Sequence, residues 1–79
     1  MMMPYQTESD LPQNVRENLP RHAQEIYRKA FNSAWKQYAD PKKRRGHDSR
    51  EETSHKVAWG AVERVYAKDH DGRWRLLRH

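Results

Sequence analysis

The chain has 79 residues and a mass of 9.6 kDa, a length that supports a single domain with a small core. It has no cysteine, which excludes disulfide bonds, thiolate catalysis and cysteine-based zinc sites. It also has no apolar run of the roughly 20 residues that a membrane span needs. Its 16 basic and 11 acidic residues give a formal net charge of +5, which favours a solubilising surface or an acidic partner such as nucleic acid.

Residues 1–8 are polar and show no period, so we expect a partly ordered segment in which Pro4 and Tyr5 dock on the folded body. A short helix should follow, capped by Ser9 or Asp10 and with Pro12 near its first turn. Because the residue before a proline avoids helical backbone angles, a corner is predicted just before Pro20. The apolar residues of this helix recur every four positions: Leu11, Val15 and Leu19.

A second helix is predicted from Pro20 to Tyr38. Small alanines let another helix approach closely while aromatic rings fill the space beside the contact. We therefore expect this helix to pack against the later helix at residues 50–68. Its broad apolar face consists of Ala23, Ile26, Tyr27, Ala30, Phe31, Ala34, Trp35 and Tyr38.

The connector at residues 39–48 is polar and contains the helix breakers Pro41 and Gly46. Its basic residues either keep the loop in water or contact phosphate or an acidic surface, in which case binding would weaken with salt. Four consecutive cations are our first candidates for partner binding: Lys42, Lys43, Arg44 and Arg45.

The pattern at residues 50–68 predicts the central helix. Ser49 and Glu52 fit a capping box, in which each side chain accepts a backbone N–H of the other residue. The apolar sector is so wide that the helix must pack on two sides. Gly60 falls on the opposite, polar side and costs about 1 kcal/mol of helix propensity. The sector contains Ser54, Val57, Ala58, Trp59, Ala61, Val62, Val65 and Tyr66.

After this helix, Asp71-Gly72 is a hairpin signal. We expect Trp74 to fold back onto the core, and a short strand around it to pair with the segment near Tyr5. Residues 76–79 should form a loose tail. The basic residues of this part are further candidates for partner binding: Arg73, Arg75 and Arg78.

The remaining polar residues predict no metal site, cofactor site or catalytic residue. The five histidines, His22, His47, His55, His70 and His79, contain no tight pair at helical ligand spacing. We expect His55 to pack against Trp59 or the preceding helix. The stretch from Asp69 to Gly72 resembles the start of a calcium loop, but the later oxygen ligands are missing.

Several short motifs occur in order along the chain and together resemble the ChaB family of small bacterial proteins. The match extends from Met3 to Trp74. The motifs are Met3-Pro4-Tyr5, Asp10-Leu11-Pro12, Leu19-Pro20-Arg21-His22-Ala23-Gln24, Ala30-Phe31-Asn32-Ser33-Ala34-Trp35, Ser49-Arg50-Glu51-Glu52-Thr53, His55-Lys56-Val57-Ala58-Trp59 and Asp71-Gly72-Arg73-Trp74.

The resemblance implies a mainly α fold: a compact small single domain of about three helices at residues 9–75, with a minimal two-stranded ribbon from the N- and C-terminal segments. It also implies a non-enzymatic protein that regulates a ChaA-type sodium or calcium/proton antiporter. The absence of cysteine suits a cytoplasmic protein, and we expect a monomer. The basic connector and C-terminus leave open an alternative, which is nucleic-acid binding. An enzyme is the third hypothesis, although no nucleophile–base pair or cofactor motif supports it.

Overall fold

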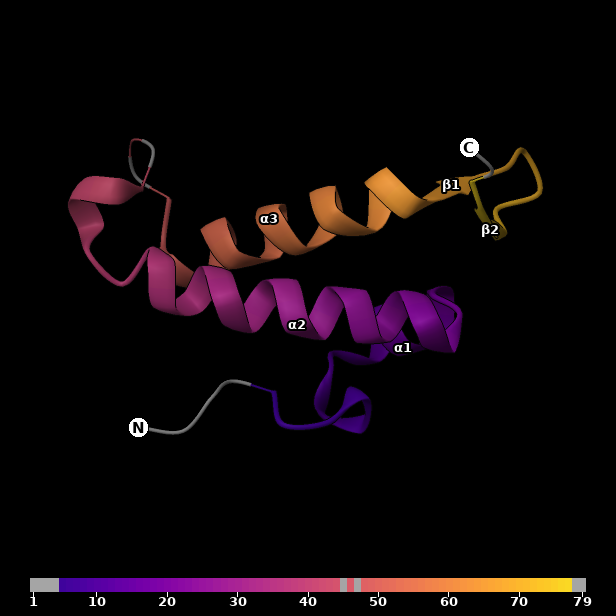
Figure 1. Cartoon of the computed structure of the whole chain (residues 1–79), viewed down its shortest axis with the longest axis horizontal. Coiled ribbons are helices and arrows are strands. Elements are labelled where there is room, and N and C mark those ends of the chain that lie inside the picture. Colours follow the sequence, from indigo (N-terminus) through magenta and orange to yellow (C-terminus); the bar gives the residue numbers. More distant parts are fainter. Residues whose placement is uncertain (1–4, 45, 47, 78–79) are drawn as a thin grey trace.

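The computed structural model of the chain describes residues 5–44, 46 and 48–77. Within these residues it contains three α-helices and a two-stranded antiparallel ribbon (Figure 1), so the predicted fold class is confirmed. The α-helices are α1 (Gln13–Asn18), α2 (Arg21–Gln37) and α3 (Arg50–Val65), and the strands are β1 (Tyr66–Lys68) and β2 (Trp74–Leu76). Two short 3₁₀ helices precede α1 and α3, namely η1 (Glu8–Asp10) and η2 (Pro41–Lys43).

The helices α2 and α3 lie side by side and form most of the core, as predicted (Figure 1). The rings of Tyr27 in α2 and Trp59 in α3 form a T-shaped contact with a centroid distance of 5.1 Å. One turn further along, the rings of Phe31 and His55 lie 4.6 Å apart. His55 therefore packs on the preceding helix, which confirms its predicted position. Small residues allow this close approach, since Ala23, Ala34, Ser54 and Ala58 are all buried.

The first helix is shorter than its apolar pattern, and its start differs from our prediction. Pro12 occupies the N-cap position of α1 and no side chain caps the helix. Asp10 instead accepts hydrogen bonds from the backbone N–H groups of Gln6 and Thr7, so the carboxylate closes the turn that contains η1 rather than α1. Leu19 has extended angles (φ −106°, ψ 139°), which confirms the predicted corner.

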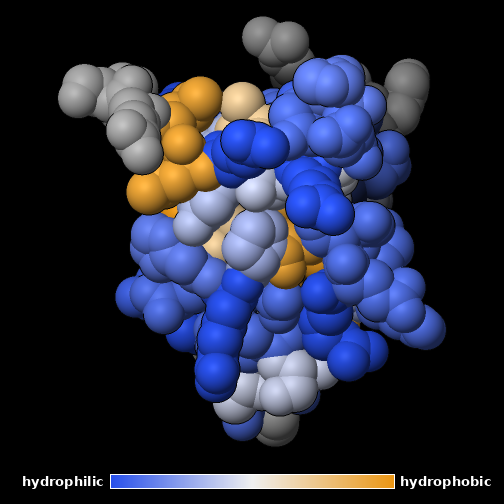
Figure 2. All heavy atoms as spheres, turned by 90° about the vertical axis from the view of Figure 1, so that its right-hand side faces the viewer, coloured by the Kyte–Doolittle hydropathy of each residue, from blue (hydrophilic) through white to orange (hydrophobic). Residues whose placement is uncertain are grey.

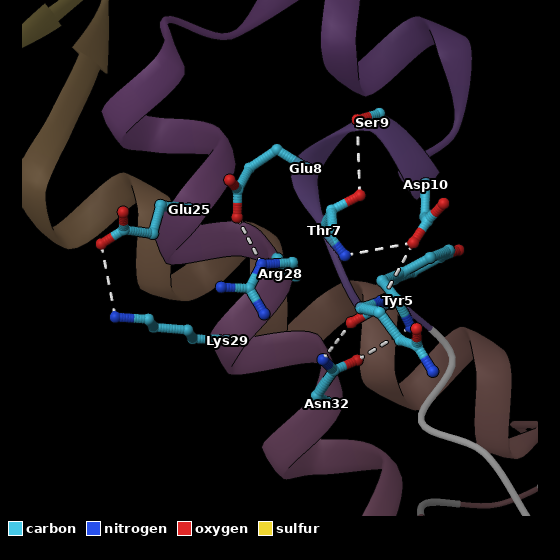
Figure 3. A network of polar contacts seen from close by, with 10 residues as sticks. Tyr5, Thr7, Glu8, Ser9, Asp10, Glu25, Arg28, Lys29 and Asn32 are labelled. Carbon is cyan, nitrogen blue, oxygen red and sulfur yellow. Dashed lines mark hydrogen bonds and ion pairs between the residues drawn. The ribbon is translucent and has the colours of Figure 1, made fainter.

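The N-terminal segment is anchored on α2 through Asn32 (Figure 3). The Tyr5 N–H donates to Asn32 Oδ1 over 3.3 Å, and Asn32 Nδ2 donates to the Tyr5 carbonyl over 2.6 Å. The Tyr5 ring lies 4.7 Å from the Phe31 ring. An ion pair joins Glu8 to Arg28. Tyr5 thus docks on the core as expected, whereas Pro4 lies outside the described residues.

The end of α3 corrects two predictions. The helix ends at Val65 instead of Lys68, because Tyr66 turns to extended angles (φ −124°, ψ 151°) and begins β1. The strand around Trp74 pairs with β1, in the register Tyr66↔Leu76 and Lys68↔Trp74, and not with the segment near Tyr5. A hairpin closes over few residues, so its loop-closure cost is lower than that of a strand pair joining the two ends of the chain.

The hairpin also holds residues that we expected in a loose tail. Leu76 is the last residue of β2, and the Leu77 N–H donates to the Val65 carbonyl over 2.7 Å. This bond satisfies a carbonyl at the C-terminus of α3 that has no partner within the helix. Trp74 stacks on Trp59 at 5.8 Å, which confirms that it folds back onto the core. The described elements run from η1, which begins at Glu8, to β2, which ends at Leu76.

Candidate interaction surface

The candidate cations of the connector lie at the end of the molecule where α2 leads into α3 (Figure 1). Lys42 and Lys43 are exposed at the end of η2, and Arg44 is half-buried. Arg45 lies outside the described residues. Asp40 caps η2 by accepting the Lys42 N–H over 3.0 Å, so a local carboxylate fixes the backbone that carries Lys42 and Lys43.

The cations of the C-terminal part lie at the opposite end, on the hairpin (Figure 1). Arg73 is exposed, whereas Arg75 Nε contacts the Asp69 carboxylate at 2.6 Å. Arg78 lies outside the described residues. The 16 residues of α3 separate the two groups by about 24 Å. Among the described residues, Lys42 and Lys43 therefore do not share one surface with Arg73 and Arg75.

The hairpin end is largely hydrophilic, with one contiguous apolar patch at the upper left and a smaller apolar area near the centre (Figure 2). Leu76 and Leu77 are exposed by 58% and 37%. The turn at this end is organised by Asp69, whose carboxylate accepts the N–H groups of Asp71 and Arg73. The hydrogen bond from the Arg73 backbone, together with that from the Arg75 side chain, lowers the pKa of Asp69. Asp69 thus serves the turn, and its oxygens are engaged by the chain itself.

At the other end, a pocket of about 290 Å³ lies between the end of α2, the connector and the first turns of α3. We call it the connector pocket. Its polar side carries two ammonium groups and one carboxylate, and Lys56 Nζ lies 2.6 Å from Asp48 Oδ2. Val57, which is 37% exposed, contributes an apolar wall. The lining consists of Tyr38, Lys43, Asp48, Thr53, Lys56 and Val57.

Two buried side-chain atoms have no hydrogen-bond partner among the described residues: Arg44 Nε and Thr53 Oγ1. Thr53 lines the pocket, and Arg44 directly follows Lys43, which also lines it. Sequence reasoning selected Lys43 but missed the other lining residues. Thr53, Lys56 and Val57 looked like ordinary helix positions, and only the path of the connector places them around one cavity.

The start of α3 is fixed firmly beside this pocket. Ser49 Oγ accepts the Glu52 N–H over 3.0 Å, and Glu52 Oε1 accepts the Ser49 N–H over 3.4 Å, which confirms the predicted capping box. Arg50 Nε donates to the Trp35 carbonyl over 2.7 Å, and its guanidinium lies 4.1 Å from the Trp35 ring centroid. These contacts tie the first turn of α3 to the last turns of α2 and hold the pocket walls in place.

Two described histidines, His22 and His55, make contacts between elements of the fold. The Tyr27 hydroxyl and His55 Nδ1 share a hydrogen bond between α2 and α3. Burial raises the pKa of Tyr27 and lowers the pKa of His55, while Glu51 opposes the shift of His55. His22 Nδ1 and the Tyr66 hydroxyl share a hydrogen bond of 2.9 Å. No group of three His, Cys, Asp or Glu side chains in the described part of the chain could hold a metal ion.

Comparisons with known proteins agree over nearly the whole chain. The family model ChaB matches residues 11–76. Proteins of Escherichia coli K12 and Shigella flexneri, each named "Putative cation transport regulator ChaB", are 61% identical over 72 residues, which cover 91% of this chain and 95% of each relative. An NMR solution structure with the same name has a TM-score of 0.79 and 57% identity, and the match covers 95% of this chain and all of that one.

Proposed function

The chain belongs to the ChaB family, and from that premise we propose that it is a non-enzymatic protein that regulates a cation transporter by binding to it. The transporter that we propose is a sodium or calcium/proton antiporter of the ChaA type. The chain would act on its cytoplasmic side, as a separate regulatory component.

The observation that supports this proposal most is the identity of 61% with relatives that are named for cation transport regulation. No helix among residues 5–44, 46 and 48–77 is long and apolar enough to cross a bilayer, so the described part of the chain would bind the transporter instead of forming a conduction path. The packed α2–α3 pair carries exposed basic side chains at both of its ends, Lys42 and Lys43 on the connector and Arg73 and Arg75 on the hairpin, and these could contact a partner.

The proposal can be tested in Escherichia coli cells that lack their own ChaB relative. Tagged chain, purified from these cells in a gentle detergent, should recover a cation/proton antiporter, and expression of the chain should change the tolerance of the cells to sodium or calcium. A matched control is a variant that does not fold, such as Tyr27→Asp, expressed from the same plasmid. Normal tolerance in all strains, with no transporter recovered, would refute the proposed function.

Nucleic-acid binding was the alternative that the charge of the sequence left open. A duplex or single strand requires several cations along one surface. The structure separates Lys42 and Lys43 from Arg73 by the length of α3, and Arg75 contacts Asp69. We therefore do not propose nucleic-acid binding as the function, and we use an oligonucleotide as a competitor in the experiments below.

A further inference from the structure

The connector pocket combines charged and apolar walls in a way that selects a particular ligand. The pocket side chains carry two positive charges, on Lys43 and Lys56, against one negative charge, on Asp48. Half-buried Arg44 follows immediately in the chain and adds to the positive potential. A carboxylate is therefore attracted, whereas an amine or a guanidinium is repelled.

The Thr53 hydroxyl points to a missing hydrogen-bond partner at the pocket. Buried polar groups in native proteins are nearly always paired, because an unpaired one costs about 1–3 kcal/mol. Within the described residues two buried side-chain atoms have no partner, Arg44 Nε in the connector and Thr53 Oγ1 in the first turn of α3. Of these two residues, Thr53 lines the pocket. An oxygen acceptor from a ligand in the pocket would satisfy the Thr53 hydroxyl, which can donate one hydrogen bond.

The remaining walls favour a carboxylate on a peptide over a phosphate group. Asp48 lines the pocket and contacts Lys56 Nζ at 2.6 Å, so the ion pair offsets one of the two positive charges and the remaining charge matches a single carboxylate better than a doubly charged phosphate. Val57 and the ring of Tyr38 form apolar surface that suits the methylene groups of a glutamate side chain and an apolar neighbour. A pocket of about 290 Å³ has room for a few side-chain atoms of this kind, not for a folded element.

We propose that the connector pocket is the docking site for an acidic peptide segment of the transporter. A glutamate or aspartate carboxylate of this segment lies between Lys43 and Lys56 and accepts a hydrogen bond from the Thr53 hydroxyl. This inference rests on the proposed function, since it names the part of the partner that is recognised. The hydrogen bonds at Ser49 and the Arg50–Trp35 contact hold both sides of the pocket, so the site is formed before the ligand arrives.

A direct test is an NMR titration of the ¹⁵N-labelled chain with the blocked peptide Ala-Leu-Glu-Glu-Leu-Ala. The amide chemical shifts of Tyr38, Thr53 and Val57 should change on addition of this peptide. The same peptide with glutamine in place of glutamate should not change them. Lys43→Gln should weaken binding roughly two- to fivefold, because one charge pair is lost. Lys42→Gln removes the same charge from the neighbouring residue, which does not line the pocket, and should have a clearly smaller effect.

Two further substitutions separate recognition from folding. Thr53→Val removes the unpaired hydroxyl and should weaken binding roughly two- to tenfold without lowering stability. Asp48→Asn removes the competing carboxylate and should tighten binding, whereas Asp71→Asn at the hairpin end makes the same charge change and should alter binding less. Equal effects of Lys42→Gln and Lys43→Gln, together with unchanged binding in Thr53→Val, would overturn the pocket as a specific site.

Competition and capture identify the partner class. Inorganic phosphate and a short oligonucleotide are each added at the same total concentration of negative charge as the peptide. Both should displace the bound peptide less well than unlabelled peptide does. Better displacement by either one would overturn the choice of an acidic peptide. In detergent capture, loss of the antiporter with Lys43→Gln but not with Lys42→Gln supports the pocket. Equal capture by both variants would refute the pocket and leave the proposed function standing, while peptide binding without any capture would refute the proposed function alone.

Discussion

Gly60 is a residue at which the chain can be stabilised. It lies inside α3, and a methyl group on it would meet no heavy atom within 4 Å. We predict that Gly60→Ala raises the free energy of unfolding by about 1 kcal/mol, which corresponds to a melting temperature higher by roughly 4–8 °C for a domain of this size. Thermal unfolding followed by circular dichroism measures the shift.

Gly72→Ala is the matched control, because Gly72 has φ +83° in the hairpin turn and alanine is strained there. This variant should melt at a lower temperature than the parent chain. An unchanged or lower melting temperature for Gly60→Ala would mean that α3 does not continue through this position as an ordinary helix.

His55 makes the stability depend on pH. Burial lowers its pKa below the ordinary value of 6.5, so below that pH the unfolded chain takes up a proton before the folded chain does. Stability is therefore complete above pH 6.5 and is lost as the pH falls from 6.5 towards the lowered pKa. We predict a lower urea midpoint at about pH 5.5 than at about pH 7.5.

His55→Gln should reduce this pH dependence, because glutamine can still accept the hydrogen bond of the Tyr27 hydroxyl but does not titrate. The carboxylates with lowered pKa values, Glu8 and Asp69, lose their contributions only below about pH 4.5 and so do not interfere. The same drop in midpoint for His55→Gln and for the parent chain would show that another group carries the effect.

At the scale of the elements, the sequence predicted the features that depend on residues close together in the chain. The apolar faces gave the α2–α3 pair, and Ser49 with Glu52 gave the start of α3, because a helix cap depends on residues that are near in sequence. The end of α3 was missed, since Tyr66 continues the helical apolar pattern equally well. Only the pairing of β1 with β2 decides that Tyr66 is extended, and that pairing is a tertiary choice.

The hairpin should be held to the helices mainly by one aromatic stack. Trp74 is half-buried and lies 5.8 Å from Trp59, whereas Leu76 on the same strand is 58% exposed. We predict that Trp74→Ala lowers the free energy of unfolding by about 1–3 kcal/mol, and that Leu76→Ala changes it by less than about 0.5 kcal/mol. Urea unfolding compares the two; similar losses would mean that the strand pairing, not the stack, attaches the hairpin.

Over the whole molecule, the candidate site was harder to predict than the fold. A run of four cations is visible in the sequence, but the residues that surround Lys43 come from α2, the connector and α3. Their proximity depends on the path of the connector between the two helices, and the period of apolar residues in the sequence does not predict that path. The separation of the two basic groups has the same origin, because the length of α3 alone sets it.

Trp59 lies where the helices and the hairpin meet, in contact with Tyr27 of α2 and Trp74 of β2. Because each part buries its apolar surface against the others, the molecule should unfold in one cooperative step, as single domains of this size usually do. We predict that tryptophan fluorescence and far-ultraviolet circular dichroism give the same urea midpoint. If the fluorescence changes at lower urea than the helical signal, the hairpin detaches first, and α2 with α3 would then form a core that is stable without it.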